Sequence, residues 1–333
     1  QYMMFFTQKG KCFWMRVYEI PEGSKTAKGR AIQNLVNIES DDKVKAFICT
    51  QDLKDQDYIK SHNLVMVTKK GQVKKTSLEK YSKPRVNGVA AITIKEGDEL
   101  LEAKLTNGES QIILAVKSGK LVRFEETKTR PMGRTASGVR GITLKDEADE
   151  VIGMVTVDKD DILDSQILVV TENGYGKRTK LVDEDGEDVY RITNRGGKGV
   201  KTLNITEKTG KLISISAVTD ADDLMIINKS GLTIRMAVED LRVMGRATQG
   251  VKLINLKGSD SIAAVTKVMK DDVAEVVVDE DGNVIEAEGI ERVKPVLEVL
   301  EDEGVEDDDD SDDDEIEDDE DSDEVGDDDD SDE

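Results

Sequence analysis

The sequence predicts an all-β domain of repeated blades over residues 1–300, followed by a disordered acidic tail at 301–333. Three observations support this prediction. A hairpin motif with a central glycine recurs five times, a second glycine-containing loop follows each hairpin, and the acidic excess of the chain is confined to the tail. Long stretches with helical periodicity are absent from the sequence.

Each repeat opens with an apolar run, a short turn that contains glycine, and a run of mixed polarity. This order is typical of a β-hairpin. The five copies read MMFFTQKGKCFWMR, LVMVTKKGQVKKT, IILAVKSGKLVRF, ILVVTENGYGKRT and LMIINKSGLTIRM, with turn glycines Gly10, Gly71, Gly119, Gly174 and Gly231. Asn173-Gly174 is the strongest signal and predicts a type I′ turn, which needs positive φ at both central residues.

A polar loop that ends in glycine and runs into an apolar strand follows each hairpin. The loop glycines are Gly29, Gly88, Gly138, Gly199 and Gly250. Their distances from the turn glycines are similar, except where the acidic insertion VDEDGEDV lengthens the fourth unit at 182–189. Units that begin near residues 1, 62, 110, 165 and 222 are long enough for one four-stranded blade each. We therefore expect one propeller-like domain, closed or open.

The charge of the chain divides into two parts. The net charge is −25, from 72 acidic and 47 basic residues, and residues 301–333 hold 25 of the acidic residues without any Lys or Arg. Residues 1–300 are therefore neutral overall, so the negative net charge of the whole chain does not exclude an anionic partner. The tail has no apolar periodicity, and we expect it to be disordered because it cannot bury enough surface.

Several classes of protein are excluded by composition. Two cysteines and one histidine are too few for a four-ligand Cys/His zinc site, so we expect no metal. No apolar stretch is long enough for a membrane-spanning helix, which predicts a cytoplasmic protein without a membrane partner. The six tyrosines lie in or beside the repeats and have no paired Arg and acidic cluster nearby. We therefore expect no catalytic residue and no cofactor in this segment.

Three positions of the repeat are basic in most copies and never acidic. The fourth residue after the turn glycine is basic in four copies, the residue four before the loop glycine is basic in four, and the residue two after the loop glycine is basic in three. The first position holds Lys75, Arg123, Arg178 and Arg235. The second holds Lys25, Arg134, Arg195 and Arg246, and in the remaining copy Arg85 follows a proline at that position. The third holds Arg140, Lys201 and Lys252.

Positions that repeat in the sequence repeat in space, so we expect belts of basic side chains around the array. Ordinary solvation of a strand face is the alternative explanation, although such a face would use both signs of charge. Basic belts on a neutral domain predict a polyanion held through its phosphates. Duplex DNA fits better than single strands, because single-strand binding needs aromatic stacking platforms and this chain is 4% aromatic.

Four segments of the chain resemble the C-terminal DNA-wrapping domain of the A subunit of bacterial DNA gyrase. They are LVMVTKKGQVKKT, ENGYGKRT, VYEIPEGSKTAKGRAIQNL and MGRTASGVRGI. The resemblance covers essentially all of residues 1–300 and implies a six-bladed β-pinwheel that bends duplex DNA around its outer edge. It also implies a parent type II topoisomerase, associated with the nucleoid, that uses ATP and Mg bound elsewhere to introduce negative supercoils. The implied protein partners are the gyrase B subunit plus a second A subunit.

Two departures from the family pattern matter. Five units are visible, and the chain lacks an initiator Met, so we expect a fragment that starts after the first blade. The family box, Gln-Arg-Arg-Gly-Gly-Lys-Gly, normally lies in that first blade, yet the loop at 193–199 keeps its last five residues. Either these glycines simply form a turn, or they let phosphates approach the backbone beside Arg195 and Lys198. The further predicted DNA-binding residues are Lys28, Arg30, Gly196, Gly197, Lys198 and Gly199.

Two other functions remain open. The related subunit of topoisomerase IV has a smaller domain without the box, and five blades would suit it. A propeller scaffold that binds proteins is the alternative from another class, and it predicts an apolar or mixed-charge rim. We favour the gyrase family because the loop at 193–199 is box-like and the opening unit resembles gyrase sequences more closely.

Overall fold

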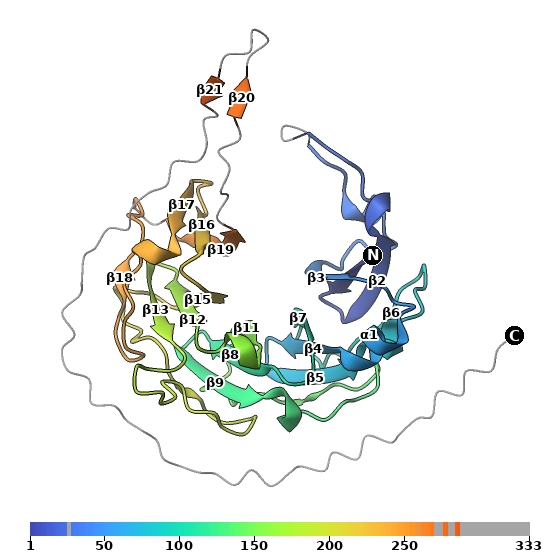
Figure 1. The fold of residues 1–333 in the computed structure, drawn as a ribbon, viewed down its shortest axis with the longest axis horizontal. Coiled ribbons are helices and arrows are strands. Elements are labelled where there is room, and N and C mark those ends of the chain that lie inside the picture. The colour runs from blue at the N-terminus through green and yellow to red at the C-terminus, as the bar shows by residue number, and fades with distance from the viewer. Residues whose placement is uncertain (25–27, 259, 270–275, 279–283, 287–333) are drawn as a thin grey trace, which may run out of the picture.

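A computed structural model describes residues 1–24, 28–258, 260–269, 276–278 and 284–286 of the chain. The predicted DNA-binding residue Lys25 and the acidic tail at 301–333 lie outside the described residues, as does the stretch 287–300 assigned to the folded domain. The described part confirms the all-β prediction. Its units follow one another in an arc, with the first and last units at the two ends (Figure 1).

Each of the five units consists of a hairpin and a third strand. The hairpins are β1 (Tyr2–Thr7) with β2 (Lys11–Arg16), β4 (Asn63–Thr68) with β5 (Gln72–Ser77), β8 (Gln111–Val116) with β9 (Lys120–Glu125), β12 (Gln166–Thr171) with β13 (Tyr175–Lys180), and β16 (Asp222–Asn228) with β17 (Thr233–Ala237). The third strands are β3 (Val44–Thr50), β7 (Leu100–Thr106), β11 (Val151–Val157), β15 (Leu212–Val218) and β19 (Ile262–Met269). These third strands line the inside of the arc (Figure 1).

Short elements connect the strands. Two-residue strands follow four of the loop glycines, namely β6 (Val89–Ala90), β10 (Val139–Arg140), β14 (Val200–Lys201) and β18 (Val251–Lys252). The helical segments are α1 (Gln56–Ser61) and the 3₁₀ turns η1 (Val17–Glu19), η2 (Ile32–Asn34), η3 (Leu78–Tyr81), η4 (Glu126–Lys128), η5 (Lys159–Asp161) and η6 (Val238–Asp240). A separate ribbon pairs β20 (Val276–Val278) with β21 (Val284–Glu286).

The fourth strand of each complete sheet comes from the next unit, which the sequence did not reveal. The sheet orders are β3-β1-β2-β6, β10-β5-β4-β7, β11-β8-β9-β14 and β15-β12-β13-β18, and within the described residues the last sheet has three strands, β17-β16-β19. The loop glycines permit this crossing. Gly138 has φ of 93°, and a Cβ there would lie 2.7 Å from the carbonyl oxygen of Val73 in the preceding unit. Neighbouring units are therefore interlocked through their backbones.

The turn between the hairpin strands differs from the expected type I′. Within the described residues only glycines have positive φ, so Asn173 does not adopt the conformation that this turn requires. Instead, the Gly174 N–H donates to the carbonyl of Thr171 at 3.1 Å, and Gly174 itself has φ of 82°. This geometry is that of a three-residue hairpin loop whose glycine forms a bulge.

The apolar core lies between the units. Ile112 and Leu114 of β8 pack with the second unit, whereas Ile113 and Ala115 of the same strand pack with the fourth. A strand that is buried on both faces needs a continuous apolar run, and every residue of β8 is buried. Strands of the end units, such as β16, alternate between buried and half-buried positions. Stability of the array therefore depends on contacts between neighbouring units.

Candidate nucleic-acid interface

Four loops carry eight of the predicted DNA-binding residues, and we call them the basic loops: 80–88, 130–138, 191–199 and 242–250. Each loop leads into a two-residue strand, and the last three run beside the outer hairpin strand of the preceding unit. The amide of Met132 donates to the carbonyl of Lys75 at 2.8 Å, and Thr193 does the same to Arg123. The amide of Met244 donates to the carbonyl of Arg178 at 2.9 Å.

The side chains four residues after the turn glycines form what we call the inner basic row: Lys75, Arg123, Arg178 and Arg235. The prediction that these residues form an exposed belt is wrong for the first three, which are 6%, 1% and 7% exposed. Their side chains point into the junction with the next unit. They therefore cannot meet a duplex lying on the outer surface of the folded domain.

Arg123 shows what this row does. Its guanidinium donates to the side chain of Gln111 at 2.8 Å in its own unit, and to the carbonyls of Leu181 at 3.3 Å and Tyr190 at 2.9 Å in the next unit. It also pairs with Asp188 at 2.8 Å. Burial lowers the pKa of Arg123, and the carboxylate of Asp188 opposes that shift. The guanidinium therefore connects two units, and it supplies a donor to the buried side chain of Gln111 and to the carbonyl of Tyr190.

Equivalent contacts occur along the row. Lys75 donates to the carbonyl of Glu126 at 3.0 Å, and Arg178 donates to the carbonyl of Leu241 at 2.6 Å. Arg235, at the end of the array, bonds Asp223 at 2.7 Å and the carbonyl of Met269 at 3.2 Å. These slots face carbonyl oxygens and must supply hydrogen-bond donors, which explains why none of them is acidic.

Two further lysines lie buried beneath the basic loops. Lys74 donates to the carbonyls of Ala91 at 2.7 Å and Arg134 at 2.5 Å. Lys177 donates to the carbonyls of Gly245 at 2.5 Å and Arg246 at 2.6 Å. Burial, together with the nearby charge of Arg134, lowers the pKa of Lys74 to about 7. Each lysine thus fixes the backbone of a basic loop from below.

The other predicted residues lie at or near the surface. Lys28, Arg30, Arg85, Arg140 and Lys198 are exposed. Arg134, Arg195, Arg246, Lys201 and Lys252 are half-buried. Arg195 donates to the carbonyls of Lys128 at 3.2 Å and Arg140 at 3.4 Å. Two of its hydrogen bonds are therefore made to the backbone of the third unit.

The glycines of the box-like loop serve the packing between units. Gly199 has φ of 75°, and a Cβ there would lie 2.5 Å from the carbonyl oxygen of Leu121. The amide of Gly196 donates to the carbonyl of Gly141 at 2.7 Å, and the carbonyl of Gly197 accepts from the amide of Thr143 at 2.9 Å. The local backbone therefore accounts for Gly196, with φ of 85°, and for Gly199, whereas a Cβ at Gly197 would meet no atom closer than 3.9 Å.

A second set of basic residues, missed by the sequence reasoning, occurs in the same loops. It occupies the position eight residues before the loop glycine, and we call it the outer basic row: Lys80, Arg130, Arg191 and Arg242. All four side chains are exposed. Aligning the repeats on the loop glycine and continuing the comparison four residues further upstream would have revealed this row.

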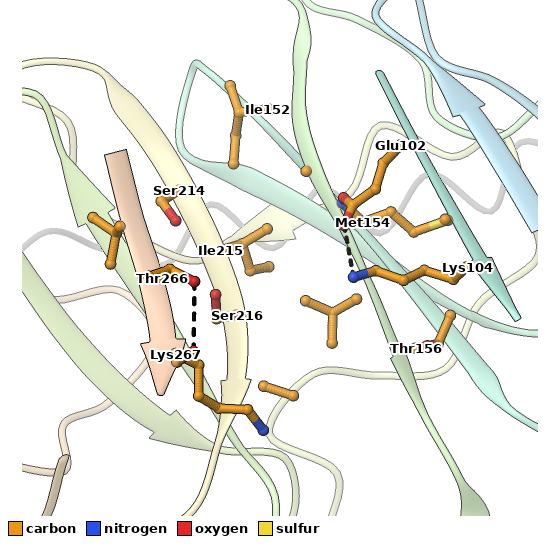
Figure 2. A pocket seen from close by; sticks show the side chains of 14 residues that line it. Glu102, Lys104, Ile152, Met154, Thr156, Ser214, Ile215, Ser216, Thr266 and Lys267 are labelled. Atoms are coloured by element: carbon orange, nitrogen blue, oxygen red, sulfur yellow. Dashed lines mark hydrogen bonds and ion pairs between the residues drawn. The ribbon is translucent and has the colours of Figure 1, made fainter. Parts of the chain in front are cut away.

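A cavity at the inside of the arc has a different character. It has a volume of about 480 Å³ and is lined by β7, β11, β15 and β19 (Figure 2). Lys104 pairs with Glu102 at 2.8 Å and Lys267 with Asp222 at 3.5 Å. Both lysines of this cavity therefore have an acidic partner.

Two kinds of site are not found in the described part of the chain. No group of three or more His, Cys, Asp or Glu side chains there could hold a metal ion. No helix there is long and apolar enough to cross a membrane.

Comparison with solved structures supports the architecture. The C-terminal domain of DNA topoisomerase IV matches with a TM-score of 0.70 at 24% identity, covering 80% of this chain and 79% of that one. The DNA gyrase A C-terminal domain matches with a TM-score of 0.65 at 22% identity, covering 80% and 82%. At these identities the similarity establishes the fold alone.

Comparison of sequences is more specific. The A subunit of DNA gyrase from Staphylococcus aureus strain MRSA252 is 41% identical over 296 residues, which cover 89% of this chain and 32% of that protein. The same subunit of strain NCTC 8325 / PS 47 is 40% identical over 297 residues. The chain thus spans about a third of the length of these curated relatives.

A family model described as "DNA gyrase C-terminal domain, beta-propeller" matches residues 1–51, 62–107, 111–158, 165–219 and 222–269. The five matched segments coincide with the five units of hairpin and third strand. The chain therefore belongs to the family of DNA gyrase C-terminal β-propeller domains.

Proposed function

We propose that the domain binds duplex DNA along its basic loops and wraps it around the outside of the arc, without reading base sequence. The observation that carries this proposal is the outer basic row, whose members Lys80, Arg130, Arg191 and Arg242 are all exposed at one repeated position. A regular series of cations on a curved outer edge matches the regular series of phosphates on bent DNA.

The loops are also held rigidly, which favours binding to a stiff polymer. Lys74 and Lys177 fix loop carbonyls from below, and the inner basic row joins the units behind the loops. Because the backbone of the loops is set before binding, only the exposed side chains must be ordered when DNA arrives. A protein-binding scaffold would need an apolar or mixed-charge rim, and the outer basic row argues against that function.

We infer that the natural context is the gyrase A subunit rather than its topoisomerase IV counterpart. The observation that supports this inference is that the curated relatives at 40–41% identity carry the gyrase name. In that context the domain supplies DNA wrapping to an ATP-dependent type II topoisomerase in the bacterial cytoplasm, together with the B subunit plus a second A subunit. ATP and Mg would be bound elsewhere in the parent enzyme, and this domain contributes no catalytic residue.

A topological assay tests the proposal directly. The protein is incubated with relaxed plasmid and a type I topoisomerase, and the linking number is measured after the protein is removed. We expect the wild-type chain to change the linking number, because wrapping traps writhe. The triple variant Arg130→Gln, Arg191→Gln and Arg242→Gln should trap much less.

A matched control removes the same charge elsewhere. Lys43, Lys54 and Lys159 are exposed lysines outside the basic loops. Their triple Gln variant should trap writhe as the wild type does. Equal loss in both variants would show that total charge matters and that the outer basic row does not mark the DNA path.

A further inference from the structure

A second cavity, separate from the basic loops, lies between the third and fourth units. It has a volume of about 390 Å³, and its lining includes five lysines and two aspartates. The lysines are Lys117, Lys120, Lys145, Lys201 and Lys211. Of these, only Lys201 belongs to the residues predicted from sequence to bind DNA.

The acidic groups near this cavity are already engaged. Asp149 is 5% exposed; its Oδ1 accepts from the amide of Ser118 at 3.0 Å and its Oδ2 from the Ser118 hydroxyl at 2.7 Å. The Oδ1 atom of Asp146 accepts from the amides of Ala148 and Asp149, both at 3.0 Å. These carboxylates stabilise the loop that bears them.

Four of the five lysines therefore have no acidic partner. Lys117 pairs with Glu150 at 2.6 Å, whereas Lys120, Lys145, Lys201 and Lys211 form no ion pair within the described residues. In the inner cavity both lysines are paired with acids, and Figure 2 shows the pair of Lys104 with Glu102. The cavity between the third and fourth units is lined by five lysines and two aspartates, and the inner cavity by two lysines and one glutamate, so the former has the larger positive excess.

Several ammonium groups around one concave surface repel one another, and an anion that reaches them together relieves that repulsion. The lining also offers the side-chain amide of Asn204 as a neutral donor. Phosphate oxygens are strong acceptors for such donors. We propose that this cavity is a binding site for a multiply charged phosphate group.

Two sources could supply such a group. Lys201 lies in β14 opposite Lys120 of β9, so the cavity borders the strand that follows a basic loop. Backbone phosphates of wrapped DNA could reach it there, and this source rests on the proposed function. A free condensed phosphate is the other source, and it does not depend on DNA wrapping.

Inorganic tripolyphosphate is the probe that tests the site itself. We expect calorimetry to detect its binding to the wild-type chain. The double variant Lys145→Gln and Lys211→Gln should weaken that binding by about tenfold or more. Both side chains are exposed, so the substitutions should leave folding intact, which a thermal melt checks. The control pair Lys54→Gln and Lys159→Gln should bind tripolyphosphate as the wild type does.

Duplex binding by the same variants distinguishes the two sources. If Lys145→Gln and Lys211→Gln also lower the salt dependence of duplex binding, DNA phosphates occupy the cavity. If duplex binding is unchanged while tripolyphosphate binding is weakened, the ligand is a free phosphate compound. Absence of tripolyphosphate binding to the wild type, or equal weakening in the control pair, would overturn the proposal.

Failure of this proposal can be distinguished from failure of the proposed function. The outer-row variant of Arg130, Arg191 and Arg242 should still bind tripolyphosphate, because none of these residues lines the cavity. If the wild-type chain traps plasmid writhe but does not bind tripolyphosphate, the cavity proposal alone fails; if it binds tripolyphosphate but traps no writhe, the proposed function alone fails.

Discussion

The inner and outer basic rows have the same kinds of side chain in the same repeats, but their surroundings are opposite. Arg123 of the inner row is 1% exposed and bonded to four groups, whereas Arg130, seven residues along the chain, is exposed. Both rows contain no acidic residue. The comparison teaches that repeated positive charge has two separate causes in this fold: a demand for buried donors and a demand for surface cations.

The largest expected effect is on stability, from the inner row. We expect Arg123→Met to lower the free energy of unfolding by about 2–4 kcal/mol, because it leaves the buried side chain of Gln111 and the carbonyl of Tyr190 without this donor. Urea denaturation measures this loss. Arg130→Met is the matched control and should change the free energy of unfolding by less than about 0.5 kcal/mol. Similar losses in both variants would remove the distinction between the rows.

The next effect is on DNA binding, from the outer row. Each phosphate contact contributes about 0.9 to the slope of log affinity against log salt, so Arg130→Gln, Arg191→Gln and Arg242→Gln together should reduce that slope by about 2.7. Fluorescence anisotropy with a short duplex at several salt concentrations measures it. An unchanged slope would exclude these arginines from the DNA path, provided the variant melts as the wild type does.

A smaller effect concerns pH and the lysine beneath a basic loop. Burial holds the pKa of Lys74 at about 7 in the folded chain, below its ordinary 10.5. Between these values the unfolded chain binds more protons than the folded chain, so this residue makes the free energy of unfolding rise with pH over that range. Lys74→Met should flatten the rise, measured by urea denaturation at about pH 6.5 and about pH 9.5. An equal pH dependence in variant and wild type would contradict the assignment.

The smallest effect should separate the two cations of the box-like loop. Arg195 is half-buried and bonds carbonyls of the third unit, whereas Lys198 is exposed. Arg195→Ala should therefore lower both the melting temperature and DNA affinity. Lys198→Ala should lower DNA affinity alone, with a loss of about 0.9 in the salt slope. A melting temperature that falls equally in both variants would assign the loop a purely structural role.

Much of the fold could be predicted from the sequence. The turn glycines and the loop glycines marked every hairpin and every crossing loop, because positive φ is readily accessible only to glycine. The apolar run of β8 also predicted a strand, and the division of charge between body and tail could be counted directly. The five-unit all-β architecture therefore followed from local rules.

The origin of the fourth strands could not be predicted in the same way. Each complete sheet takes a strand such as β10 from the next unit, and a two-residue strand carries too little pattern to show which hairpin it pairs with. The turn type at Asn173-Gly174 was also wrong, since a bulged loop and a type I′ turn both use glycine. Pairing between distant segments decides both features.

The sequence by itself determined the repeat, the positions of obligatory glycine and the repeated basic slots. Only the tertiary structure decided which slots face water. Residues 75, 123 and 178 lie in hairpin strands, and a strand has two faces; here both faces are covered, one by each neighbouring unit. A basic residue there meets carbonyls, whereas the same residue on the outside of a loop meets solvent. Sequence periodicity specifies that a side chain repeats, but the packing of the next unit specifies what it contacts.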